Sequence, residues 1–179
     1  MTHTELVEQA AKWARKKWPV VVTEITTTWG EEPDVICFKT GSSLLIEVKA
    51  SRGDFLADRN KPFRQPGIWS LGKYRCYFTN PGIAAADEVP LGWGLYEFDG
   101  KRVRGVVPIP FKYNSAPGFE NEKRHIKLEM GILLSVIRRL GRGVDNATSI
   151  KAYTHQTKCR TTVHIDTTRH SNTNQDLGG

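Results

Sequence analysis

The sequence predicts an α/β (α+β) fold, in which helices flank a mixed central β-sheet. Segments with helical periodicity alternate with β-branched runs in the order helix, strand, hairpin, helix, strand, hairpin, helix. The chain has 179 residues with 39% hydrophobic side chains, enough for one core of ordinary size. No apolar run approaches the roughly 20 residues of a transmembrane helix, so no membrane attachment is expected.

The first predicted element is a helix over residues 4–17. Thr4 is a candidate N-cap, Glu5 and Glu8 stand in the first turns, and "RKK" ends the segment, as the helix dipole favours. The β-branched run at 20–29 then predicts a strand.

The middle of the chain predicts two hairpins around a further helix and strand. "DVICFK" and "SLLIEVKAS", joined by "TGS", form the first hairpin. "GDFLADRN" predicts a short helix, 61–73 a loop, and "YRCYFTN" a strand. A second hairpin is expected around Asp99 and Gly100.

The clearest helical pattern covers 120–140, where large apolar residues recur on one face. These are Ile126, Met130, Leu133, Leu134, Ile137 and Leu140. We therefore expect a core at 1–112, an amphipathic helix at 113–145 that is packed on or appended to that core, and a polar tail at 146–179. The tail is rich in Thr, His and Asn and has the composition of a disordered segment.

The charge is unevenly distributed. The chain has a formal net charge of +7, yet residues 1–60 carry 8 basic and 9 acidic side chains, whereas residues 61–140 carry 13 and 7. A basic middle suits a polyanionic partner, nucleic acid first, although a basic balance alone also occurs in proteins that bind none.

Three cysteines, Cys37, Cys76 and Cys159, form an odd set without CxxC spacing. Two of them lie in strand-like runs and are expected to be small buried hydrophobes. A disulfide framework is not expected, and the first residues contain no signal-peptide core. We therefore expect a cytoplasmic protein.

Charged side chains stand at the centre of the strand "SLLIEVKAS". Because successive side chains of a strand alternate between faces, one face is apolar, and the other presents Glu47 and Lys49. Asp34 opens the adjacent strand and lies about as far from the turn near residue 41 as Lys49 does. The hairpin is thus expected to place Asp34 beside Glu47 and Lys49.

Two neighbouring carboxylates repel unless a cation lies between them. Mg²⁺ is usually held by one or two carboxylates together with waters and substrate phosphate. A lysine in the same patch can orient water and stabilise charge on a phosphate oxygen. The set predicts metal-assisted phosphodiester hydrolysis, and the alternative is a Glu–Lys pair on a solvated strand face with Asp34 in a turn.

"PD" at 33–34, followed by a hairpin with "EVK" at 47–49, resembles the PD-(D/E)xK nuclease superfamily. "EVKASRGDFLADRNK", "KYRCYFTNP" and "WGLYEFDG" are similar to its MmcB-like branch of bacterial and phage DNA-repair proteins, with Ala50 in place of the first serine of that branch. The resemblance covers 20–107. It implies a restriction-endonuclease-like core, in a bacterial cell or a phage-infected host.

The resemblance also implies roles for individual residues. Asp34, Glu47 and the backbone carbonyl of Val48 would bind Mg²⁺ (or Mn²⁺). Lys49 would position the attacking water and stabilise the transition state.

Glu24 would complete the metal shell, with Glu5 or Glu8 as alternatives from the first helix. Asp54 is expected to cap the helix that follows the strand. Asp58 is expected to pair with Lys61 or Arg64.

A phosphate backbone needs cations around the acidic residues, and unpaired bases stack on aromatic rings. The side chains expected to contact nucleic acid are Arg52, Arg59, Lys61, Arg64, Lys73, Trp69 and Tyr74.

These inferences converge on a metal-dependent deoxyribonuclease, expected to cut as an endonuclease. Two alternatives on the same fold stay open: a catalytically inactive nucleic-acid-binding module and a host-protein-interaction module. Single- and double-stranded DNA are both open as substrates, as is a homodimer.

Overall fold

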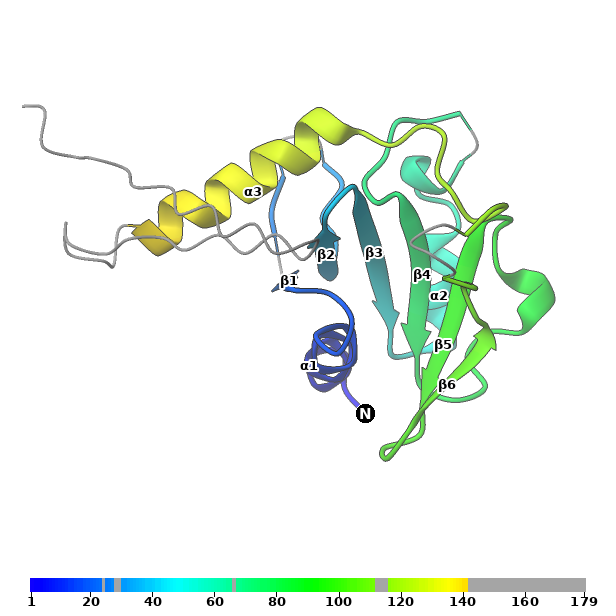
Figure 1. The fold of residues 1–179 in the computed structure, drawn as a ribbon. Coiled ribbons are helices and arrows are strands. Elements are labelled where there is room, and N and C mark those ends of the chain that lie inside the picture. The colour runs from blue at the N-terminus through cyan, green and yellow to red at the C-terminus, as the bar shows by residue number, and fades with distance from the viewer. Residues whose placement is uncertain (24, 28–29, 66, 112–115, 142–179) are drawn as a thin grey trace, which may run out of the picture. The chain divides into compact units, whose positions relative to one another are not determined.

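The computed structural model describes residues 1–23, 25–27, 30–65, 67–111 and 116–141. The chain divides into two compact units, Met1–Leu133 and Leu134–Gly179. The helices are α1 (His3–Ala14), α2 (Arg52–Asp58) and α3 (Ile126–Gly141) (Figure 1). The strands are β1 (Val20–Thr23), β2 (Val35–Lys39), β3 (Ser42–Lys49), β4 (Tyr74–Thr79), β5 (Trp93–Phe98) and β6 (Val103–Val107). None of the helices in the described part is long and apolar enough to cross a membrane.

The six strands form one mixed sheet in chain order, β1 to β6. β3 runs parallel to β4 and β4 to β5, whereas the three remaining pairs are antiparallel. Both predicted hairpins are present. The prediction of a mixed sheet in an α/β (α+β) fold is therefore confirmed.

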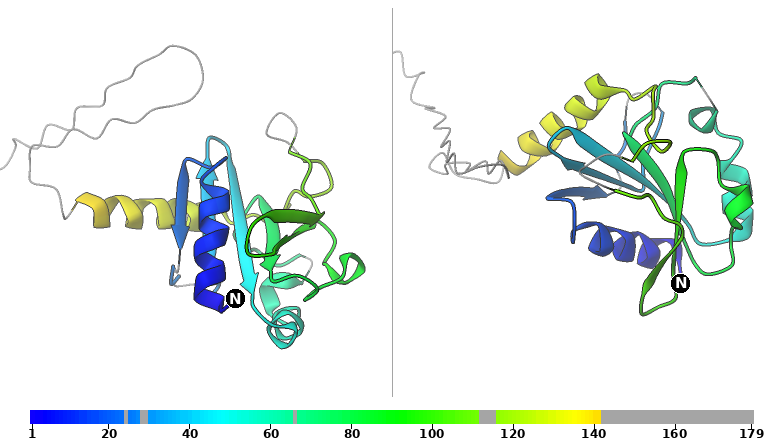
Figure 2. Two further views of the ribbon diagram at one scale, coloured as in Figure 1. Left: turned by 90° about the horizontal axis from the view of Figure 1, so that it is seen from below. Right: turned by 45° about the vertical axis from the view of Figure 1, so that its right-hand side comes forward.

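Helix α1 covers one face of the sheet (Figure 2). Its Leu6, Val7 and Ala10 pack with Leu44 and Ile46 of β3 in the main hydrophobic core. The helix begins earlier than the sequence predicts, because Thr2 rather than Thr4 is the N-cap. The Thr2 side chain accepts from the Glu5 backbone N–H at 3.3 Å, and the Glu5 carboxylate accepts from the Thr2 N–H at 2.9 Å.

Helix α2 lies on the opposite face of β3 from α1. Its Phe55 meets Tyr77 of β4 edge-on, with ring centroids 5.1 Å apart. The expected Asp54 cap is wrong. Ser51 is the N-cap, and its hydroxyl accepts from the Asp54 backbone N–H at 3.2 Å.

Helix α3 begins at Ile126, six residues later than predicted, because the preceding segment bonds to the loop before β4. Asn121 N donates to Lys73 O at 2.8 Å, and His125 N donates to Ser70 O at 2.9 Å. Residues 116–133 therefore belong to the same compact unit as the sheet, beyond the boundary expected at 112. The polar tail expected at 146–179 lies outside the described residues.

The first turns of α3 bury a different face from the one that the apolar pattern predicts. Ile126 and Met130 are 60% and 54% exposed, whereas Glu129 and Ile132 are buried. Glu129 accepts hydrogen bonds at 2.8 Å from both the Ser43 hydroxyl and the Gly72 backbone N–H. A carboxylate that satisfies these buried donors fixes the start of the helix against the sheet.

Candidate active site

The candidate site lies where the β2–β3 ladder ends. The last paired residues are Val35 and Ile46, so Asp34 precedes the ladder on one strand and Glu47 follows it on the other. The Val48 backbone N–H donates to Asp34 Oδ2 at 2.7 Å. This hydrogen bond takes the place of a ladder bond, because Val48 has no paired residue on β2. The hairpin register thereby holds an acidic side chain at the end of β3.

The lysine of the motif joins three carboxylates. Lys49 Nζ lies 3.0 Å from Glu47 Oε2, 3.1 Å from Asp58 Oδ1 and 4.0 Å from Asp34 Oδ2. The side chains of Glu47 and Lys49 are only 2% and 8% exposed. The alternative of a Glu–Lys pair on a solvated face is therefore wrong, because these charges are buried against α2 and its neighbours.

Arg64 supplies a second buried cation to the same cluster. It approaches Asp58 Oδ2 at 2.7 Å, Glu47 Oε2 at 2.9 Å and Glu31 Oε1 at 3.3 Å. Its side chain is 2% exposed, so the expectation that Arg64 contacts nucleic acid at the surface is wrong. Burial of a guanidinium requires paired carboxylates, and the chain supplies three.

Asp58 has more partners than the sequence predicts. It pairs with both Lys61, at 3.0 Å, and Arg64, and it also accepts from the Tyr77 hydroxyl at 3.0 Å. The pairing with Lys61 and Arg64 was among the expectations. Glu31 and Tyr77 were missed, because Glu31 lies in the turn just before the motif and Tyr77 lies on another strand, and neither position signals that the side chain points into the cluster.

The cluster shifts the protonation of its members. Burial raises the pKa of Glu47, although Arg64 and Lys49 oppose the shift. Burial likewise raises the pKa of Glu31 to about 7. For Asp58, burial acts in the same sense, but Arg64 and Lys49 outweigh it and hold the pKa of that carboxyl below its usual range.

Lys49 stays protonated in this environment. Burial alone would lower the pKa of its ammonium, but the carboxylates of Glu47, Asp58 and Asp34 outweigh burial and raise it. The site therefore offers a fixed cation rather than a neutral amine.

The donors present fit a cation that needs few protein ligands. Glu47 Oε1 is buried and has no hydrogen-bond partner in the described structure. The two backbone groups of a strand residue point to the same side, so the Val48 carbonyl faces the Asp34 side as its N–H does. Two carboxylates and a carbonyl suit Mg²⁺, which keeps several waters. Within the described ranges, no group of three or more His, Cys, Asp or Glu side chains could hold a metal.

The expected third acid is not found among the described residues. Glu24 lies outside them. Glu5 is engaged in the cap of α1, and Glu8 lines a hollow further along that helix. The side chain of α1 that reaches Asp34 is His3, with Nε2 3.2 Å from Oδ1. The sequence pattern gave no reason to single out a histidine at the start of a helix.

Three of the expected nucleic-acid contacts belong to α2 and the residues directly after it. Arg52 is held by the Glu88 carboxylate and by the Ile83 carbonyl, which accepts at 2.9 Å. Arg59 is exposed, and Lys61 keeps 54% of its side chain exposed while it pairs with Asp58. These cations follow the strand end that carries the acidic cluster.

The other three lie at the far end of β4. In the β3–β4 register, Tyr74 pairs with Leu44 and Thr79 pairs with Lys49. Tyr74 therefore lies about 16 Å along the strand from the end that carries Lys49. Tyr74 is fully buried in the core, and the expectation that it stacks on a base is wrong. Lys73 pairs with Glu120 at 3.4 Å, and the exposed Trp69 ring meets His125 edge-on. The structure does not bring this group to the acidic cluster.

Comparisons with known proteins bear on the fold alone. No protein-family model matches the sequence, and no curated protein is significantly similar to it. A similar solved structure is that of a protein of unknown function from Silicibacter pomeroyi. It superimposes with a TM-score of 0.55 at 21% sequence identity, covering 83% of this chain and 99% of that chain.

Proposed function

We propose that this chain is a metal-dependent DNA endonuclease with a restriction-endonuclease-like core of the PD-(D/E)xK type. The observation that carries the proposal is the orphaned Glu47 Oε1 beside Lys49 and Asp34 at one strand end. A buried carboxylate oxygen without a partner is costly. A cation bound there would remove that cost.

Asp34, Glu47 and the Val48 carbonyl would hold Mg²⁺ or Mn²⁺. The bound ion would supply Lewis-acid stabilisation of the phosphate and lower the pKa of a coordinated water. The hydrogen bond from Val48 N–H fixes Asp34, and the Arg64 contact fixes Glu47 through its other oxygen. Both acids are thus oriented by the fold before any ligand binds.

Lys49 would act as a cation. Its raised pKa keeps it protonated, so it donates to the attacking water or to a phosphate oxygen and does not remove a proton. The ammonium stabilises negative charge as it develops on the phosphate, and such electrostatic stabilisation is often the largest contribution to rate.

The test is cleavage of circular single-stranded DNA and of plasmid DNA with Mg²⁺, with Mn²⁺ and with EDTA. Lys49→Met and Glu47→Gln are compared with Lys101→Met, which removes an exposed cation in the turn between β5 and β6. We expect metal-dependent cutting that falls at least about 100-fold in the first two variants and stays near wild type in the third. Cutting that survives Lys49→Met, or that proceeds in EDTA, would contradict the proposal.

A second candidate is a catalytically inactive nucleic-acid-binding module. The Arg64–Glu47 contact favours it, because an internal guanidinium already neutralises the carboxylate. This candidate would be supported over the nuclease if the wild type binds DNA but cuts it with neither Mg²⁺ nor Mn²⁺.

A further inference from the structure

We propose that the groove between α1 and β1 binds the phosphate backbone of a single nucleic-acid strand as it passes the candidate active site. The inference rests on the proposed function and adds a substrate path to it. The sequence gives no sign of this groove, because the basic residues at the end of α1 are also explained by the helix dipole.

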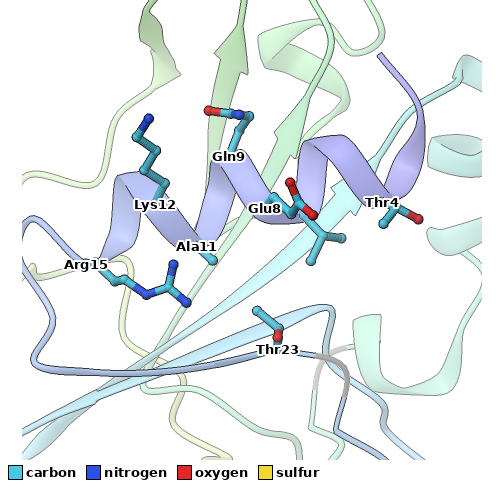
Figure 3. A pocket seen from close by; sticks show the side chains of 8 residues that line it. Thr4, Glu8, Gln9, Ala11, Lys12, Arg15 and Thr23 are labelled. Atoms are coloured by element: carbon cyan, nitrogen blue, oxygen red, sulfur yellow. The ribbon is translucent and has the colours of Figure 1, made fainter.

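The groove is a hollow of about 540 Å³ between one helix and the edge strand of the sheet (Figure 3). The residues that line it are Thr4, Val7, Glu8, Gln9, Ala11, Lys12, Arg15 and Thr23. Figure 3 shows the Arg15 guanidinium reaching into the space between α1 and Thr23. A recess bounded by one helix and one strand receives one backbone rather than two.

The groove begins at the candidate site. Thr4 follows His3, whose imidazole lies 3.2 Å from Asp34 Oδ1. On the other wall, Thr23 pairs with Val35, the residue directly after Asp34. Both walls therefore start from neighbours of the same carboxylate, and the groove leads away from it along α1.

Among the described residues, no acid forms an ion pair with the cations of the groove, Lys12 and Arg15. Among the described lining residues, Glu8 supplies one carboxylate, which forms no ion pair with Lys12. The described lining thus has two cations without ion pairs against one acid, a positive balance next to a cluster of acids.

The length of the groove along α1 suits a polymer rather than a small anion. The 12 residues of α1 span about 18 Å, and Arg15 lies just beyond its last turn. This length covers several nucleotides of a strand. A phosphodiester held at Asp34 would place its neighbouring phosphates along the groove, toward Lys12 and Arg15.

The test measures binding without cleavage, by fluorescence anisotropy of a labelled single-stranded oligothymidine in EDTA. Lys12→Gln/Arg15→Gln is compared with Lys123→Gln/Lys127→Gln, a pair of exposed cations at the start of α3 with the same change in charge. We expect about 10-fold weaker binding for the groove pair only. The slope of log affinity against log salt should fall by about 1.4, or 0.7 for each lost phosphate contact.

Several results would overturn the inference. Wild-type affinity in the groove pair would do so, as would an equal loss in the control pair, which would show general electrostatic attraction. An unlabelled duplex that competes as well as the single strand would overturn the assignment to one strand. If the wild type cuts DNA while the groove pair binds normally, only this inference fails. If the wild type neither binds nor cuts nucleic acid, the proposed function fails with it.

Discussion

Arg64 Nη2 lies 2.9 Å from Glu47 Oε2, so a buried guanidinium from the 3₁₀ helix Pro62–Arg64 after α2 holds the acid near the end of β3. The same group reaches Asp58 and Glu31. One side chain thus contacts three acids from three segments of the chain. We therefore expect Arg64 to contribute both to the stability of the fold and to the orientation of Glu47.

Replacing Arg64 by Met leaves buried carboxylates without their shared cation. Breaking a buried ion pair on one side costs about 3–5 kcal/mol, and we expect a loss of that size in the free energy of unfolding, measured with urea. The control is Arg59→Met, an exposed cation nearby, which should change stability by no more than about 0.5 kcal/mol. Equal effects of the two substitutions would show that the network contributes little.

Metal should stabilise the fold through Asp34. With Mn²⁺ at about 100 times its dissociation constant, the free energy of unfolding should rise by about 2.7 kcal/mol, and excess EDTA should reverse the gain. Asp34→Asn keeps an oxygen for the Val48 N–H and should abolish the effect. Asp87→Asn, at an exposed position, should retain it. A gain that persists in Asp34→Asn would place the ion elsewhere.

Glu31 should make stability fall as the pH rises. Its pKa is about 7 in the folded state and 4.5 when unperturbed, so between these values the folded protein binds the proton more tightly than the unfolded chain. The contribution is therefore greatest below about pH 4.5, declines up to pH 7 and is then constant, with a total of up to about 3 kcal/mol. Subtracting the pH profile of Glu31→Gln from that of the wild type isolates this slope, and a flat difference would contradict the prediction.

Gly72 occupies a position that admits no side chain. Its φ is +84°, and an added Cβ would lie 2.7 Å from Tyr74 O and 2.8 Å from Leu45 Cβ. Gly72→Ala should cost about 3 kcal/mol or more, since strain adds to a steric clash. Gly67 has a φ of +80° with open space around it, so Gly67→Ala should cost only about 1 kcal/mol. Thermal unfolding of the pair separates strain from clash, and similar melting temperatures would rule out the clash.

The sheet could be predicted from the sequence because its signals are local. Alternation in β3 and the tight turn at Gly41 fix the register that sets Asp34 against the end of β3. The position of Arg64 could not be predicted, because a loop residue becomes buried only through partners such as Glu31, 33 residues away. The buried face of α3 was mispredicted for a related reason. Helical periodicity predicts that the face with the most apolar residues is buried. Glu129 is buried instead because it accepts hydrogen bonds from a backbone N–H and a hydroxyl that are distant in sequence.

Cys37 and Cys76 lie on the strands that flank β3, and both are buried in the core beneath α1. Burial raises the pKa of the Cys37 thiol to about 12, so a thiolate scarcely forms while the core is closed. Alkylation of either thiol must await separation of α1 from the sheet. The two cysteines therefore report opening of the core, and their alkylation rates, followed by mass spectrometry, would measure how often α1 separates from the sheet.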